Sequence, residues 1–192
     1  MLVPVVGPSG AGKDTLMDAA RARLARDPRF VFARRHITRP AEAGGEDHLP
    51  LSVTEFRRMQ QEGGFALWWE AHGLLYGIPS AMEVALEGGR VVVANLSRTV
   101  LAEAASRYPM RILNITAPYH VLAARLAARG RESAADIESR LAREAVLPAA
   151  LPVETVLNDG SVEQGVERVL AALSRAAADA RPTEKAHPAP PG

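Results

Sequence analysis

The sequence of 192 residues contains no cysteine, which excludes disulfide bonds, thiolate metal ligands and cysteine nucleophiles. Aromatic residues make up only 5% of the chain, and a net charge of +1 gives no general attraction to nucleic acid. The first apolar run, residues 2–6, is too short for a membrane span or a signal peptide. We therefore predict a cytoplasmic protein that binds neither nucleic acid nor membrane. The length and the apolar content of 47% predict a single domain.

A glycine-rich segment separates the apolar residues 2–6 from an amphipathic stretch, which is the order strand, loop, helix. Such a loop lets backbone N–H groups converge on phosphate, and Lys13 can reach the outer phosphates of a nucleoside triphosphate. An ordinary glycine-rich turn would need the glycine spacing, the strand and the helix to coincide by chance. The predicted nucleotide-binding residues are Gly7, Pro8, Ser9, Gly10, Ala11, Gly12, Lys13, Asp14 and Thr15.

Asp14 stands where this loop motif usually has the Ser or Thr that holds Mg²⁺, and Thr15 supplies a hydroxyl one residue later. Since Mg²⁺ accepts carboxylate, hydroxyl and water oxygens, Asp14 and Thr15 are predicted to bind it directly or through water. A carboxylate in the first turn of a helix also interacts favourably with the helix dipole. Both roles remain open for Asp14.

Apolar runs alternate with amphipathic stretches along the chain, which predicts an α/β fold with a parallel sheet of about five strands covered by helices. We predict sheet strands at residues 2–6, 30–33, 90–95, 111–116 and 155–158. Helices are expected at residues 14–25, 79–89, 118–128 and 161–178. Two further helices are expected, one that ends at residue 107 and one that begins after Ser133. Between them we expect a loop at 41–50, a helix to 61 opened by the capping box Ser52 and Glu55, and two short strands within 65–79.

The alternation of apolar runs and amphipathic stretches predicts a single domain over residues 1–180. Within it we expect an acceptor lobe at about 35–80 and a helical lid at about 129–145. Residues 181–192, rich in Pro and Ala, are predicted to be disordered. A small-molecule kinase needs a lobe that encloses the acceptor and an arginine-bearing lid that neutralises transition-state charge. The predicted catalytic residues are Lys13, Arg129, Arg131 and Arg140, and a solvated helix face is the alternative for the three arginines.

Trp68 and Trp69 are interpreted as packing residues of the acceptor lobe. Tyr76 adjoins Gly77, where backbone can approach a ligand, and is equally consistent with packing and with binding. His48 is balanced between polar packing and contact with substrate phosphate. The predicted substrate-binding residues are Arg35, Arg39, His48, Tyr76, Asn95, Ser97 and Arg98.

The phosphate loop, Thr38-Arg39-Pro40, Tyr76-Gly77 and the arginines of the lid occur in the order seen in guanylate kinases, and this similarity covers roughly residues 2–175. Within that superfamily the chain most resembles the ribose 1,5-bisphosphate phosphokinase family, enzymes of phosphonate degradation that make phosphoribosyl pyrophosphate. The narrower resemblance is carried by residues 12–14, 37–39, 46–48, 74–77, 95–98, 129–132 and 158–161.

Two departures from guanylate kinases support the narrower resemblance. Glu42 replaces a second phosphate-binding arginine of guanylate kinases. Leu67 stands about where those enzymes have the acidic residue that reads guanine, and a leucine cannot accept a hydrogen bond from the base. The resemblance therefore implies that ATP, with Mg²⁺, phosphorylates a phosphorylated sugar, ribose 1,5-bisphosphate. Guanylate kinase acting on GMP is the alternative, and a non-catalytic binding module is less favoured because the phosphate loop is complete.

Overall fold

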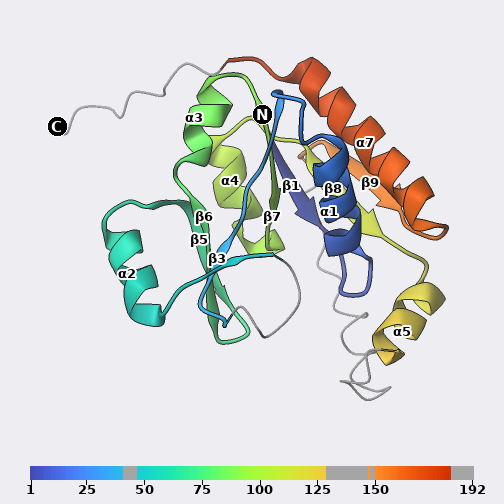
Figure 1. The fold of residues 1–192 in the computed structure, drawn as a ribbon, viewed down its shortest axis with the longest axis horizontal. Coiled ribbons are helices and arrows are strands. Elements are labelled where there is room, and N and C mark those ends of the chain that lie inside the picture. The colour runs from blue at the N-terminus through green and yellow to red at the C-terminus, as the bar shows by residue number, and fades with distance from the viewer. Residues whose placement is uncertain (41–46, 129–146, 148–149, 183–192) are drawn as a thin grey trace.

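The computed structural model describes residues 1–40, 47–128, 147 and 150–182. A parallel sheet of five strands in the order β2-β7-β1-β8-β9 forms the centre of this part of the chain (Figure 1). The predicted α/β architecture with a five-stranded parallel sheet is therefore confirmed. The strands are β1 (Leu2–Val6), β2 (Phe30–Phe32), β7 (Val91–Asn95), β8 (Ile112–Thr116) and β9 (Val153–Leu157).

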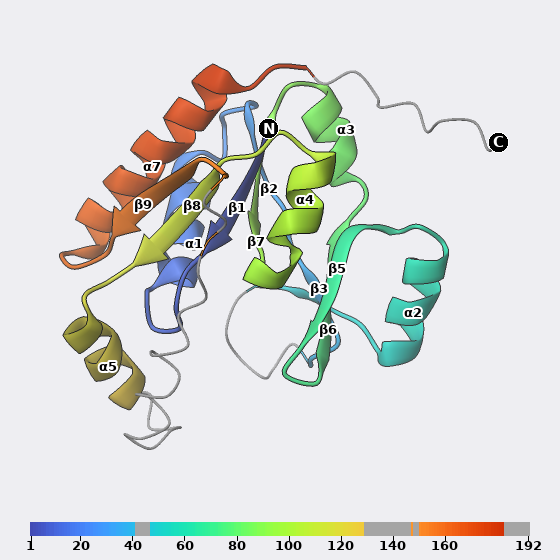
Figure 2. The ribbon, with the colours of Figure 1, turned by 180° about the vertical axis from the view of Figure 1, so that it is seen from behind.

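Helices cover both faces of this sheet (Figures 1 and 2). Successive side chains of a strand point to opposite faces, and β7 shows the result: Val91 and Val93 join one core cluster, Val92 and Ala94 the other. The first cluster includes residues of α1 (Lys13–Arg23), α5 (Tyr119–Ala127) and α7 (Val162–Asp179). The second includes residues of α3 (Met82–Glu87) and α4 (Leu101–Arg107). No helix of the described residues is long and apolar enough to cross a membrane.

A second sheet, in the order β4-β3-β6-β5, lies within the predicted acceptor lobe together with α2 (Val53–Gln61). Its strands are β3 (His36–Ile37), β4 (Leu49–Pro50), β5 (Phe65–Ala71) and β6 (Leu74–Pro79). The capping box of α2 is confirmed, because the Ser52 hydroxyl accepts from the Glu55 N–H at 3.2 Å and the Glu55 carboxylate accepts from the Ser52 N–H at 2.8 Å. The two predicted strands around a turn are β5 and β6.

Two local predictions in this lobe were wrong. Residues 49 and 50 form β4 instead of a loop, because the backbone N–H of Leu49 donates to the carbonyl of Arg35 at 2.8 Å. Pro79 ends β6 instead of opening a helix, since α3 begins at Met82. In both cases the segment pairs with a strand residue that is distant in the sequence, Leu49 with His36 and Pro79 with Phe65.

The two tryptophans of β5 differ in environment, although both were expected to pack inside the lobe. Trp69 is 5% exposed and joins the core cluster on the α3 and α4 side, whereas Trp68 is 39% exposed. Adjacent residues of a strand point to opposite faces, so only one of the pair can reach this core. The packing interpretation holds for Trp69 and fails for Trp68.

Candidate active site

The phosphate loop occupies residues 7–12, between β1 and α1, at the carboxyl edge of the sheet. A Cβ on Gly7 would lie 1.9 Å from the carbonyl oxygen of Ile115, so the loop can cross β8 only with glycine there. Gly12, with φ of 84°, precedes α1 and provides no side-chain cap. The Lys13 ammonium donates to the carbonyl oxygens of Gly7 at 2.8 Å and Pro8 at 3.0 Å. The first N–H groups of α1 and the Lys13 ammonium thus lie close together, in a position where an anion can bind.

Asn158 supports this loop from the end of β9. Its side-chain amide is buried, with 6% of the residue exposed, and donates to the carbonyl of Ala11 at 2.8 Å. A Cβ on Gly12 would lie 2.6 Å from the same amide nitrogen, so the two residues fit only because one is glycine. Asn158 was not among the predicted site residues; its position just after a strand, in the run Asn158-Asp159-Gly160-Ser161, was the available signal.

A cavity of about 320 Å³ adjoins the loop on the side of α5 and α7. Ligand sites commonly have volumes of a few hundred Å³, so the cavity can admit part of a nucleotide. One guanidinium nitrogen of Arg125 lies 3.5 Å from the carbonyl of Gly10. The cavity is lined by Gly10, Gly12, Thr15, Leu16, Arg125, Ala128, Asn158, Gly160 and Val162.

A smaller cleft lies on the other side of α1, against the ends of β2 and β7. Its lining residues are Asp14, Met17, Asp18, Arg21, Phe32, Ala33, Arg35 and Asn95. Consecutive helical residues point about 100° apart, and accordingly Asp14 lines this cleft while Thr15 lines the larger cavity. The structure thus separates the two predicted Mg²⁺ ligands and places Asp18, one turn after Asp14, on the same cleft.

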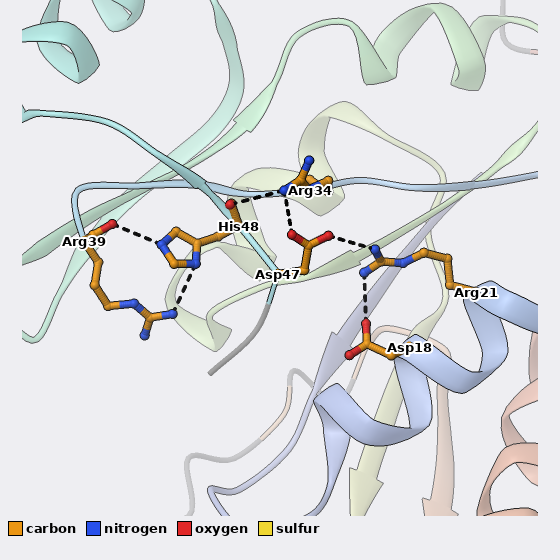
Figure 3. Close-up of polar contacts among 6 residues, drawn as sticks. All are labelled: Asp18, Arg21, Arg34, Arg39, Asp47 and His48. Atoms are coloured by element: carbon orange, nitrogen blue, oxygen red, sulfur yellow. Dashed lines mark hydrogen bonds and ion pairs between the residues drawn. The ribbon is translucent and has the colours of Figure 1, made fainter. Parts of the chain in front are cut away.

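A chain of charged side chains joins α1 to the acceptor lobe (Figure 3). The Asp47 carboxylate accepts from Arg21 at 3.1 Å and from Arg34 at 2.5 Å, and Arg21 also donates to Asp18 at 3.1 Å. Burial raises the pKa of the Asp47 carboxyl, but the hydrogen bonds from Arg21 and Arg34 outweigh it and hold the pKa below its ordinary value. Asp47 therefore remains ionised. Its carboxylate joins Arg21 of α1 to Arg34, which precedes β3, while Asp47 itself precedes β4.

His48 holds Arg39 through both nitrogens of its ring (Figure 3). The Nε2 atom lies 3.0 Å from the carbonyl oxygen of Arg39, which can only accept, so Nε2 carries the proton. The Nδ1 atom lies 3.4 Å from a guanidinium nitrogen of Arg39 and accepts from it. His48 is 6% exposed, and the buried Nε atom of Arg39 has no hydrogen-bond partner among the residues that the structure describes. The structure gives His48 a supporting contact with Arg39, and its predicted contact with substrate stays a prediction.

The other predicted substrate-binding residues occupy different positions. Arg35 and Asn95 line the smaller cleft, and the ring of Tyr76 stacks on that of Trp69. The Ser97 hydroxyl accepts from the N–H of Thr99 at 3.3 Å and so caps the 3-10 turn η2 (Arg98–Val100). Ser97 thus has a structural role, and its contact with substrate remains a prediction. The predicted lid arginines Arg129, Arg131 and Arg140 lie outside the described residues.

Leu67 and Gly77 both lie against other parts of the protein. Leu67 is 1% exposed and packs in the core, lining neither the cavity nor the cleft. A Cβ on Gly77 would lie 2.5 Å from the ring of Phe65, so this glycine makes room for an aromatic ring. Gly77 is buried, and the approach of a ligand to its backbone stays a prediction.

The complete phosphate loop, the helix-covered parallel sheet and the hollows on either side of α1 define a P-loop kinase. A crystal structure of guanylate kinase from Anaplasma phagocytophilum shares this fold, with a TM-score of 0.61 over 91% of this chain and 85% of that chain at 19% identity. The chain belongs to the ribose 1,5-bisphosphate phosphokinase family, as the comparison with curated relatives shows.

Three relatives of this family illustrate the match. Ribose 1,5-bisphosphate phosphokinase PhnN of Rhizobium etli is 48% identical over 175 residues, covering 90% of this chain and 89% of that protein. The PhnN of Agrobacterium fabrum is 45% identical over 183 residues, covering 94% and 100%. A bifunctional ribose 1,5-bisphosphokinase-thymidine phosphorylase of Cupriavidus necator is 49% identical over 186 residues, which are 94% of this chain and 31% of that protein. No protein-family model matches the sequence.

Proposed function

We propose that this protein transfers the terminal phosphoryl group of ATP to the 1-phosphate of ribose 1,5-bisphosphate. The bond between the β–γ bridging oxygen and the γ-phosphorus breaks, an oxygen of the 1-phosphate bonds to that phosphorus, and ADP leaves. The product is 5-phosphoribosyl 1-pyrophosphate. The observation that carries the proposal is the presence of two hollows on opposite sides of the α1 N-terminus, in a chain 45–51% identical to named PhnN proteins. We assign the donor to the larger hollow and the acceptor to the smaller one.

The donor phosphates would bind to the N–H groups of residues 7 and 9–13 and to the Lys13 ammonium. The cavity beside Arg125 and Asn158 would receive the rest of the nucleotide, because it opens on the same loop. Asn158 would act through the loop, since its amide is committed to the carbonyl of Ala11.

The residues on the smaller cleft fit Mg²⁺. Asp14 is exposed at the first turn of α1, its carboxylate oxygens are ligands that Mg²⁺ prefers, and Asp18 lies on the same cleft. Among the described residues no group of three or more acidic or histidine side chains could hold a metal, so nucleotide phosphates and water would complete the ligand set. When bound, the ion would neutralise phosphate charge during transfer. Asp14 would hold it directly or through water.

The acceptor would bind on the side of Arg35, Arg39 and Asn95. Its attacking atom is a phosphate oxygen that is already ionised at neutral pH, so the reaction needs no general base. Catalysis then depends on alignment and on neutralisation of charge. We assign the second task to Lys13 together with the lid residues Arg129, Arg131 and Arg140.

A coupled assay that offers ATP with either ribose 1,5-bisphosphate or GMP tests this function. Turnover of the sugar bisphosphate, lost in Lys13→Ala with the circular dichroism spectrum unchanged, is the expected result. Efficient turnover of GMP with none of the sugar would restore guanylate kinase as the function. Failure to bind ATP with Mg²⁺ in calorimetry would instead support a non-catalytic binding module.

A further inference from the structure

Two aromatic rings in the acceptor lobe contact one arginine. Trp69 of β5 and Tyr76 of β6 stand directly opposite each other, and their rings stack at a centroid distance of 5.4 Å with 5° between their planes. The guanidinium carbon of Arg35 lies 5.7 Å from the Trp69 ring centroid and 5.1 Å from that of Tyr76. Arg35, Trp69 and Tyr76 form what is called here the Arg35 stack.

The Arg35 stack connects the core of the protein to the smaller cleft. Trp69 is 5% exposed and belongs to the core cluster that also contains Leu67 and Ile78. At the other end Arg35 lines the cleft together with Asp14 and Asn95. A core residue, whose conformation is fixed by close packing, is thereby in contact with a cation in the cleft that we assign to the acceptor.

The contacts within the stack suit the recognition of a phosphate. A guanidinium carries five N–H donors in its own plane and can bind a phosphate with two of them at once. Contact with the aromatic rings restrains the long side chain through cation–π attraction, which does not use those donors. A side chain that is ordered before the ligand binds loses less conformational entropy on binding, and this raises affinity.

We infer that Trp69 is a positioning residue that orders Arg35 in the smaller cleft, and that Arg35 binds a phosphate of the acceptor. The chemical identity of this acceptor rests on the proposed function. Tyr76 is the second support of the guanidinium, and Trp69 acts on the acceptor only through Arg35.

Kinetics of matched variants test the inference. Trp69→Leu is expected to raise the KM for the acceptor at least tenfold and to leave the KM for ATP within twofold. Trp69→Phe keeps a ring face and should recover most of the affinity. The control is Trp68→Leu, because Trp68 is 39% exposed, contacts Arg57 and lies outside the Arg35 stack. Equal effects of Trp69→Leu on both KM values, or an effect as large from Trp68→Leu, would overturn the inference.

A double-mutant cycle separates positioning from a direct contact. Arg35→Ala alone is expected to raise the acceptor KM as much as Trp69→Leu or more. In the Arg35→Ala background, Trp69→Leu should then change the acceptor KM less than twofold. A full additional effect would mean that Trp69 contacts the acceptor itself, and the positioning role would be wrong.

Tryptophan emission gives a test that does not require replacement of Trp69. The sequence has two tryptophans, so Trp69 is the sole emitter in a Trp68→Phe variant. Saturating ribose 1,5-bisphosphate should change this emission, and Arg35→Ala should remove the change at acceptor concentrations that saturate each variant. An unaltered response in Arg35→Ala would overturn the inference. If the wild-type enzyme phosphorylates GMP and not the sugar, the proposed function fails, and the same titrations with GMP still decide the role of the Arg35 stack.

Discussion

His48 and Arg39 are joined by a two-point contact in which one imidazole nitrogen donates to the backbone carbonyl of Arg39 and the other accepts from its guanidinium. The geometry fits the tautomer with its proton on Nε2, and the ring fixes the backbone and the head group of the same residue. Among the described residues the buried Nε atom of Arg39 has no hydrogen-bond partner, so the contact with His48 supplies most of the polar environment that the structure gives this side chain. The pair turns a flexible cation into an oriented one.

Replacing the His48 imidazole should weaken binding of the acceptor, because the imidazole holds Arg39 in place. His48→Phe breaks both hydrogen bonds, each worth about 1 kcal/mol, so the KM for the acceptor is expected to rise about 5- to 30-fold. Steady-state kinetics of His48→Phe, Arg39→Ala and the double variant measure the coupling. In the Arg39→Ala background the second change should have little effect. Additive losses would show instead that His48 contacts the substrate independently.

Asn158→Ala should disturb the phosphate loop. The variant leaves the buried carbonyl of Ala11 without its partner, at a cost of about 1 to 3 kcal/mol, and this cost falls on the loop that binds the donor phosphates. ATP binding measured by calorimetry should weaken about tenfold. Asp159→Ala is the matched control, because Asp159 is the next residue and pairs with Arg168 at 2.9 Å on the surface. If both variants bind ATP equally well, Asn158 has no role in the nucleotide site.

Asp14→Asn distinguishes the metal role of this residue from its helix-dipole role. If Asp14 is a metal ligand, the variant should need a several-fold higher Mg²⁺ concentration for half-maximal activity, and its melting temperature should be nearly unchanged. If Asp14 only interacts with the helix dipole, the variant should lose about 0.3 to 1 kcal/mol of stability, and its Mg²⁺ requirement should be unaltered. Thr15→Val completes the comparison: since Thr15 lines the other cavity, we expect its Mg²⁺ dependence to match that of the wild type.

Stability should fall in mild acid because of His36. Burial lowers the pKa of the His36 imidazole, and the positive charge of Arg34 lowers it further. The unfolded chain binds this proton as pH drops below about 6.5, while the folded protein does not, so the free energy of unfolding decreases until pH reaches the folded pKa. Above about pH 6.5 the imidazole is neutral in both the folded and the unfolded protein, so it does not make the free energy of unfolding depend on pH.

His36→Phe should remove that part of the pH dependence. The replacement keeps a ring beside Phe65, whose centroid lies 5.6 Å from that of the imidazole, and removes a buried Nδ1 atom that has no hydrogen-bond partner in the described part of the chain. Urea denaturation at pH 7.5 and 5.0 should show a smaller loss of stability in the variant than in the wild type. An identical loss would assign the acid sensitivity to other groups.

Local signals in the sequence determined the phosphate loop, the five parallel strands and the cap of α2. The loop depends on glycines and a lysine at fixed spacing, the strands on continuous apolar runs such as residues 91–94, and the cap on Ser52 and Glu55. These features depend on contacts between residues close in the chain or on solvent exclusion from one apolar segment. A single sequence displays both kinds of information directly.

Tertiary structure alone decided which side chains share a surface. Adjacent residues take different environments: Trp69 packs in the core while Trp68 is exposed, and Asp14 lines one cleft while Thr15 lines the other cavity. Leu49 became a strand residue, and Asn158 a support of the loop, through partners 14 and 147 residues away. Such contacts depend on how the sheets and helices pack against each other, because a local pattern fixes the period of an element and not the partner that it meets.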